Sequence, residues 1–206
     1  MPRDLFPDLT INRIAPGEYC SMRQGGIIST LLGSCVAACL YDSVNGIAGM
    51  NHFMLTSRRY SKKLPFFEAE SGRYGNYAME LLINDMLKAG ASRGQLRAKV
   101  FGGAAILRKS EVMDNFACVG SVNCRFIEEF LTAERIPLVT SDLGGEQGRI
   151  IYFDTRDYSV YVRKIKRTHS VKVAERDHSV WQREIRKHEH RHVPDVTTAE
   201  NVELWI

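Results

Sequence analysis

The sequence lacks the features of secreted, membrane-spanning and zinc-binding proteins. No apolar run is long enough to cross a bilayer, and the first residues have no signal-peptide core. The five cysteines are an odd number, with no Cys-x-x-Cys pair and no histidines at metal-ligand spacing. This argues against a disulfide framework and a zinc site. We therefore expect a cytoplasmic protein with free thiols, no membrane insertion, no metal and no cofactor.

The charge pattern gives little evidence for nucleic-acid binding. The net charge is only +4, and the basic residues concentrate between Arg163 and Arg191, a region that also contains most of the histidines. This stretch has neither interleaved glycines nor an RNA-binding signature. We interpret it as a solvated basic extension and expect no nucleic-acid partner.

A chain of 206 residues, 44% hydrophobic and 25% charged, is long enough for one well-buried core. We expect a leader over residues 1–15, one domain over 16–166 and the basic extension over 167–206. The extension should be either mobile or held against the domain by a few anchors, for which Trp181 and Trp205 are the candidates.

Apolar runs bounded by turn residues predict strands. The predicted strands are 27–32, 36–41, 47–55, 98–101, 138–141, 150–153 and 159–165, the last two joined as a hairpin through 154–157. Residues 56–71 are polar and basic around a proline, which indicates a loop.

Helical periodicity predicts a helix over 74–89, with Gly90 as its C-cap. Its inward face is predicted to consist of Tyr77, Leu81, Leu82 and Met86. A second helix is predicted from Ser121, as N-cap, to about residue 134. A short helix is predicted over 180–190. Strand runs with separated helices favour a single α+β domain with a mixed β-sheet over a regular βαβ array.

Cys35 and His52 each interrupt an apolar run that predicts a buried strand. The turn over residues 42–46 would join these two strands and bring the two side chains together. A thiol attacks as its thiolate, and an adjacent imidazole takes the proton and stabilises the charge. A lone buried cysteine and a lone buried histidine are usually packing residues. Here the Gly33-Ser34 corner and the connecting turn favour a catalytic pair.

The sequence around these residues resembles the CheD family, the chemoreceptor glutamine deamidases of bacterial and archaeal chemotaxis. The motif Thr-Leu-Leu-Gly-Ser-Cys begins the resemblance, which covers roughly residues 15–165 in the family's motif order. It rests on residues 30–42, 49–55, 73–79, 99–104, 142–145 and 148–149. The resemblance implies a β-sandwich-like core flanked by helices, with Cys35 as catalytic nucleophile and His52 as catalytic base.

The resemblance also implies a third catalytic residue, a threonine that orients the histidine. Thr30 fits the motif, although Ser29 would take this position in a register with one more residue before the cysteine. Alternation along the strand decides only weakly between the two, since neighbouring residues face opposite ways. A third interpretation, in which Thr30 merely favours the strand, stays open. Backbone N–H groups around Gly33 and Ser34 are candidates to stabilise an oxyanion.

The sequence leaves open the roles of two further sets of residues, a glycine pair and the other cysteines. Gly102 and Gly103 are candidate substrate-side residues, with a plain tight turn as the alternative. Cys39 shares the strand face of Cys35, but its apolar neighbours favour a packing role. Cys118 and Cys124 lie near a predicted helix start and are expected to be structural.

The expected activity is hydrolysis of selected receptor glutamines to glutamate through a glutamyl thioester, with chemoreceptor cytoplasmic domains as substrates. Two alternatives stay open. The same chemistry would serve a thiol hydrolase on another acyl substrate or a receptor methyl-esterase. The chain could also act mainly as an adaptor that binds receptors or a CheC-type phosphatase, the second partner that the resemblance implies.

Overall fold

The computed structural model describes residues 9–55, 70–106 and 119–189, in which the strands form two sheets. The first sheet has the order β1-β3-β8-β9, with parallel pairing of β1 and β3 and antiparallel pairing elsewhere. Its strands are β1 (Ile11–Arg13), β3 (Ile27–Leu32), β8 (Arg149–Asp154) and β9 (Val160–Lys164).

The second sheet has the order β2-β5-β4-β6-β7, antiparallel except for the parallel pair β6 and β7. Its strands are β2 (Tyr19–Arg23), β5 (Ile47–Asn51), β4 (Val36–Asp42), β6 (Arg97–Gly102) and β7 (Leu138–Leu143). The helices of the described residues are α2 (Glu70–Lys88), α3 (Val119–Ala133) and α4 (Arg167–Glu189), and a 3-10 turn lies at Arg93–Gln95.

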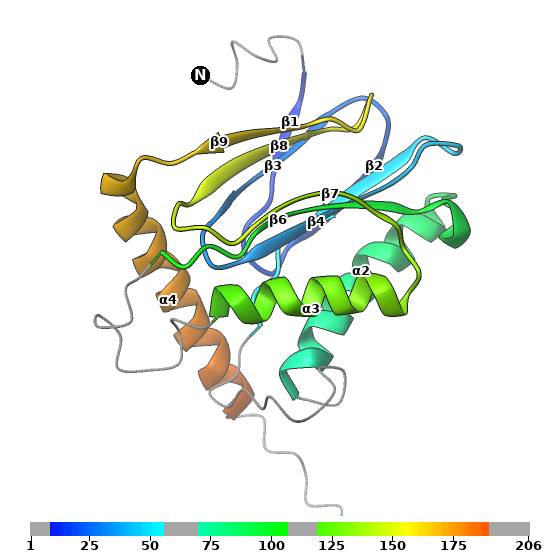
Figure 1. Cartoon of the computed structure of the whole chain (residues 1–206). Helices are drawn as coiled ribbons and strands as arrows, with labels where there is room; N and C mark the ends of the chain where they lie inside the picture. Colours follow the sequence, from blue (N-terminus) through cyan, green and yellow to red (C-terminus); the bar gives the residue numbers. More distant parts are fainter. Residues whose placement is uncertain (1–8, 56–69, 107–118, 190–206) are drawn as a thin grey trace, which may run out of the picture.

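The two sheets face each other, and helices α2 and α3 cover the outer face of the second sheet (Figure 1). One apolar cluster fills the space between the sheets, where Ile28 and Phe153 of the first sheet meet Ala48 and Met50 of the second. Another fills the space between the second sheet and the helices. The expected α+β architecture, a β-sandwich-like core flanked by helices, is confirmed.

Every strand predicted from the sequence is present, and β8 and β9 form the expected hairpin. The prediction missed β1 and β2, because both are short and neither has a buried apolar run. β1 falls within the expected leader and α4 within the expected extension, where Trp181 is buried. The domain boundaries themselves stay predictions.

The helix predictions need three corrections. Tyr77 is 63% exposed and Leu81 is only partly buried, whereas Leu82 and Met86 are buried as predicted, together with Met79 and Ile83. Ser121 lies inside α3, which begins two residues earlier at Val119. The short helix predicted over 180–190 is the C-terminal half of the longer α4. Gly90 does follow α2 with a positive φ of 109°, as a C-cap glycine should. The predicted loop over 56–71 falls mostly outside the described residues.

A buried arginine braces the loop between β7 and β8. The Arg149 side chain is 1% exposed and forms an ion pair of 2.9 Å with Asp142 Oδ1. Its guanidinium also donates to the carbonyl oxygens of Asp142, Gly144 and Gln147. Gly144 N–H in turn donates to Gly102 O at the end of β6. A buried cation thus holds this loop against the second sheet.

Among the described helices, none combines the length and the apolar character that a membrane crossing requires.

We expect Arg149→Lys to lower the free energy of unfolding by about 3 kcal/mol. A lysine ammonium cannot replace a planar guanidinium that donates hydrogen bonds to several acceptors. Urea unfolding followed by circular dichroism measures this loss. Arg163→Lys, at an exposed position on β9, is the matched control and should stay within about 0.5 kcal/mol of the parent. Equal losses in the two variants would show that the Arg149 contacts contribute nothing specific.

Candidate active site

The strand register brings Cys35 and His52 onto one face. Residues 36 and 53 form an antiparallel bridge, with Val36 N–H donating to Phe53 O at 3.0 Å and Phe53 N–H to Val36 O at 2.9 Å. Val36 and Phe53 belong to the core beneath the helices. Because side chains alternate along a strand, Cys35 and His52 point the other way, into the space between the sheets, as diagonal neighbours across the pair. The hairpin expected through residues 42–46 is confirmed.

His52 is fixed by its backbone and by its ring. Its carbonyl accepts Gly17 N–H at 2.7 Å, and its own N–H donates to Glu18 O at 2.9 Å. On the ring, Nδ1 lies 2.7 Å from Thr30 Oγ1, which also lies 2.7 Å from Ile14 O. The residue is only 1% exposed. The orientation of the imidazole is therefore set by three segments of chain.

The hydrogen bonds of Thr30 determine the tautomer of His52. A carbonyl oxygen can only accept, so the single hydroxyl hydrogen of Thr30 goes to Ile14 O. His52 Nδ1 must then carry a hydrogen and donate it to Thr30 Oγ1. Nε2 is left with a lone pair, and no hydrogen-bond partner reaches it within the described part of the chain. A bare Nε2 is the form of imidazole that can accept a proton from a thiol.

Of the two hydroxyl residues considered from the sequence, Thr30 is the one that lies against the imidazole. It shares a strand face with Ile28 and Leu32, which belong to the cluster between the sheets. Ser29 is on the opposite face of β3, together with Ile27 of the small outer cluster. The geometry therefore supports the register without the extra residue.

The surroundings favour the uncharged forms of both members of the pair. Burial, assisted by the positive charge of Arg176, lowers the pKa of His52 from 6.5 to about 3. Burial raises the pKa of the Cys35 thiol well above its usual value, and the negative charge of Asp177 raises it further. The sequence predicted a thiolate beside an imidazolium. The shifts of both pKa values favour a neutral thiol and a neutral imidazole instead.

The loop that carries Cys35 is supported by a buried asparagine. Asn123 of α3 is fully buried, donates from Nδ2 to Ser34 O at 2.8 Å and accepts Leu55 N–H on Oδ1 at 2.8 Å. It therefore links the segment before the nucleophile to the segment that follows His52. The sequence alone does not predict this role. Its one signal is a polar residue among apolar positions of the inward face of α3.

Gly102 and Gly103 lie directly behind the nucleophile. Gly103 N–H donates to Cys35 O at 2.7 Å, and Ala104 N–H donates to Gly33 O at 2.8 Å. Gly102 has a φ of 116°, and a Cβ on it would lie 2.2 Å from Cys35 O. Both the backbone conformation and the close approach therefore require glycine there.

Helix α4 reaches the site, which the sequence analysis did not foresee. Asp177 Oδ2 accepts Ser34 N–H at 2.9 Å and lies 3.2 Å from Ser34 Oγ. The fully buried Asp177 is paired with Arg176 at 2.6 Å. A Cβ on Gly33 would lie 2.3 Å from Asp177 Oδ2. Glycine at this position allows α4 to pack closely, and it has no positive φ.

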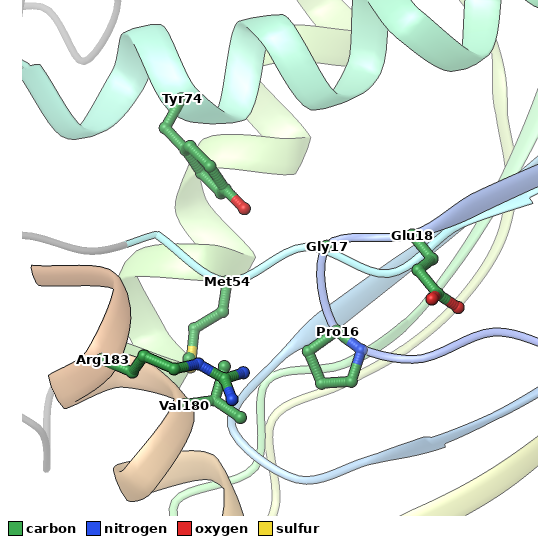
Figure 2. A pocket seen from close by; sticks show the side chains of 7 residues that line it. All are labelled: Pro16, Gly17, Glu18, Met54, Tyr74, Val180 and Arg183. Carbon is green, nitrogen blue, oxygen red and sulfur yellow. The ribbon is translucent and has the colours of Figure 1, made fainter. Parts of the chain in front are cut away.

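A cavity of about 310 Å³ lies between α2, α4 and the loop before β2, and its lining does not include Cys35 or His52. It is lined by Tyr74 of α2, by Val180 and Arg183 of α4, by Met54, and by the loop residues Pro16, Gly17 and Glu18. Figure 2 shows Tyr74 on one side, the two α4 residues on the other, and Met54 between them. The bridge between residues 36 and 53 places Met54 opposite Cys35, so the cavity adjoins the strand positions of the pair.

The other cysteines differ from Cys35 in their surroundings. Cys39 is fully buried in the same cluster between the sheets, and burial raises its thiol pKa. Cys20 and Cys124 are free thiols of intermediate burial, and Cys118 lies outside the described residues. Over the described ranges, His, Cys, Asp and Glu side chains form no group of three or more that could hold a metal ion.

Comparisons with known proteins agree on one family. The family model described as "CheD chemotactic sensory transduction" matches residues 54–164. Three relatives are each named a probable chemoreceptor glutamine deamidase CheD. The one from Geobacter sulfurreducens is 55% identical over 95% of this chain and 94% of its own length. The relatives from Shewanella oneidensis and Herminiimonas arsenicoxydans are 47% and 42% identical, over 76% and 84% of this chain and 77% and 85% of their own lengths.

The depressed pKa of His52 predicts acid sensitivity. The unfolded chain takes up the proton near pH 6.5, whereas the folded protein does so only near pH 3. The unfolded state therefore binds more protons in this window, and folding stability falls as the pH falls. Between pH 7 and pH 5 we expect His52 to cost about 2 kcal/mol of unfolding free energy. Urea unfolding of the parent and of His52→Gln at several pH values measures the difference, and parallel curves would contradict the shift.

Proposed function

This chain belongs to the CheD family of chemotactic sensory transduction proteins, and from that membership we propose that Cys35, His52 and Thr30 hydrolyse glutamine side chains of chemoreceptors to glutamate. The relatives are named as chemoreceptor glutamine deamidases, that is, protein-glutamine glutaminases. The observation that carries the assignment of residues is the 2.7 Å contact between Thr30 Oγ1 and His52 Nδ1, which leaves Nε2 free to act as a base.

The first half of the reaction forms a thioester. His52 Nε2 accepts the Cys35 Sγ proton as the sulfur attacks the carbonyl carbon of the glutamine amide. The resulting tetrahedral adduct carries a negative oxygen and the amide nitrogen. The imidazolium then donates its proton to that nitrogen, the C–N bond breaks and ammonia leaves. The glutamyl group remains on Cys35 as a thioester.

The second half restores the enzyme. His52 Nε2, again neutral, takes a proton from a water molecule as the water oxygen attacks the thioester carbon. The C–S bond breaks, the sulfur recovers its proton from the imidazolium, and glutamate is released. In both halves Thr30 keeps the hydrogen of His52 on Nδ1, so that Nε2 is always the atom that exchanges protons.

The backbone near the nucleophile provides candidate donors for the negative oxygen. Ser34 N–H lies beside Cys35, and a preorganised donor of this kind contributes about 3 kcal/mol to the transition state. We assign Gly33 and Ser34, with Gly102 and Gly103 behind them, to the wall that receives the substrate glutamine. The position of Gly33 and Ser34 directly before Cys35, and the backbone contact of Gly103 with Cys35, support this assignment.

We further propose that the protein acts in the cytoplasm, on the cytoplasmic domains of methyl-accepting chemoreceptors. A reducing compartment keeps the Cys35 thiol free. A CheC-type phosphatase is the second partner we propose, following the family resemblance.

We expect Cys35→Ser to abolish deamidation and to leave the fold intact, because a serine hydroxyl is far harder to ionise than a thiol. The measurement is the intact mass of a receptor cytoplasmic fragment, which gains ~1 Da for each amide converted to a carboxylate. The matched control is Cys39→Ala, four residues away on the same strand face, which should keep most of the activity. Equal loss in the two variants, with native circular dichroism, would mean that Cys35 is not the nucleophile.

Thr30 offers a graded test of the orienting contact. Thr30→Ser keeps the hydroxyl and should retain most of the activity, whereas Thr30→Val keeps the shape and should lower kcat about tenfold or more. His52→Ala should abolish turnover. Carbon-13 spectra of the imidazole report the tautomer directly, and only Thr30→Val should mix the two neutral forms. If Thr30→Val left the tautomer unchanged, another group would fix the ring.

A further inference from the structure

The nucleophile is closed off in this structure. Cys35 is 0% exposed and His52 is 1% exposed. An amide carbon must come into contact with Sγ before it can be attacked, so a receptor glutamine cannot react with this arrangement. Some element that packs over the pair must move before catalysis. The moving element should be one that makes only a few contacts near the sulfur. It should not be one of the strands that position Cys35 and His52.

Helix α4 has this position. It lies at one end of the two sheets, after β9 (Figure 1). Its buried residues Val173, Ala174 and Trp181 face the protein, and Trp181 belongs to the same apolar cluster as Cys35. Two of its side-chain atoms, Val173 Cγ1 and Asp177 Oδ2, would clash with a Cβ on Gly33. α4 therefore packs directly on the turn that presents the nucleophile.

The polar contacts of α4 are made with groups that the reaction needs. Asp177 Oδ2 accepts Ser34 N–H at 2.9 Å. A negatively charged oxygen thus lies where a backbone donor would otherwise stabilise the oxyanion of the tetrahedral adduct. Arg176 holds the carboxylate from its other side, with its Nη2 atom 2.6 Å from Asp177 Oδ1 and 3.1 Å from Leu31 O. The carboxylate oxygen is negatively charged like the oxyanion of the transition state, and it occupies the position that the oxyanion would take.

The charges on α4 also oppose the reactive protonation states. The negative charge of Asp177 raises the pKa of the Cys35 thiol, and the positive charge of Arg176 lowers the pKa of His52. Forming a thiolate beside a carboxylate and an imidazolium beside a guanidinium is unfavourable in both cases. Arg176 also lowers the pKa of the Cys35 thiol, but this effect is smaller than the increase caused by burial and by the charge of Asp177.

We propose that α4 is an autoinhibitory cap, in which the Asp177 carboxylate occupies the oxyanion position at Ser34 N–H and keeps Cys35 inactive until the helix is displaced. This inference rests on the proposed function, since it concerns the regulation of that same site. The cavity of Figure 2 indicates where the opening begins. Val180 and Arg183 of α4 form one wall of it and Met54, opposite Cys35 in the strand register, forms another. Displacement of α4 would extend this cavity to the thiol.

The first test measures how accessible Cys35 is to iodoacetamide in the full-length protein. Asp177→Asn removes the charge, and Asp177→Ala removes both the charge and the acceptor. Peptide mapping by mass spectrometry separates alkylation of Cys35 from that of the other cysteines. The matched control is Glu175→Gln, which neutralises an exposed carboxylate on the same helix. We expect Cys35 to react about tenfold faster or more in the two Asp177 variants, the factor typical of losing one charged hydrogen bond, and at the parent rate in the control.

The second test measures turnover of a short glutamine peptide by its mass gain. A peptide lacks the receptor surface that would displace α4, so the parent should turn it over slowly. Both Asp177 variants should turn it over faster than the parent and Glu175→Gln. Faster alkylation with slower peptide turnover would overturn the proposal, since Asp177 would then assist the reaction. Unchanged alkylation in folded Asp177 variants would overturn it as well.

Where an Asp177 variant fails to fold, hydrogen exchange of the parent protein tests the same idea. The amides of α4 should exchange faster than those of β4 under native conditions, because the cap opens without global unfolding. Equal exchange of the two elements would contradict a movable cap. Failure of the proposed function looks different: receptor deamidation would then survive Cys35→Ser, while the alkylation rates of the Asp177 variants would still report on the cap.

Discussion

The hydroxyl of Thr30 is the contact on which the chemistry of this site depends. It has one hydrogen, and a backbone carbonyl on its other side takes that hydrogen. The imidazole of His52 must therefore donate from Nδ1 and present a bare Nε2. One side-chain hydroxyl, placed between a carbonyl and a ring, thus selects the basic atom. Neither residue could do so without the β1–β2 connection that supplies Ile14.

The site is built at the junction of the two sheets, and each sheet supplies a different part. The second sheet carries Cys35 directly before β4 and His52 directly after β5, and the backbone hydrogen bonds between residues 36 and 53 fix the relative position of the two residues. The first sheet carries Thr30, which fixes the rotation of the ring. Packing of one sheet on the other, through the apolar cluster between them, therefore sets the alignment of all three residues. Loosening that packing would disturb the tautomer before it disturbed the fold.

Burial of a reactive thiol has opposite consequences for stability and for reactivity. An apolar enclosure favours the neutral thiol and the neutral imidazole, so both members of the pair are stable and unreactive when covered. Opening the site restores water and lowers the cost of charging both groups. In the proposed cap, the Asp–Arg pair of helix α4 stabilises the covered, uncharged state and no longer contacts the site in the open state. Displacement of α4 would then both expose Cys35 to the substrate and make the thiolate easier to form.

The sequence alone determined the parts that depend on local pattern and on intrinsic reactivity. The strand runs and the hairpin that brings Cys35 near His52 can be predicted from the sequence, because turn residues and alternation act over a few positions. The role of Cys35 as the nucleophile stays a prediction. Tyr77 and Ser121 were misassigned, since helix periodicity does not by itself say which face packs or where a helix begins. Between Thr30 and Ser29, alternation gave only a weak preference.

Tertiary structure decided the contacts between distant segments. The carbonyl that orients Thr30 is 16 residues away, the amide that braces Ser34 is 89 away, and the carboxylate that caps it is 143 away. Pairing at such separations is set by the packing of whole elements, and no local pattern records it. Gly33 looked like a turn residue in the sequence. It is glycine for another reason, because helix α4 fills the space where its side chain would be.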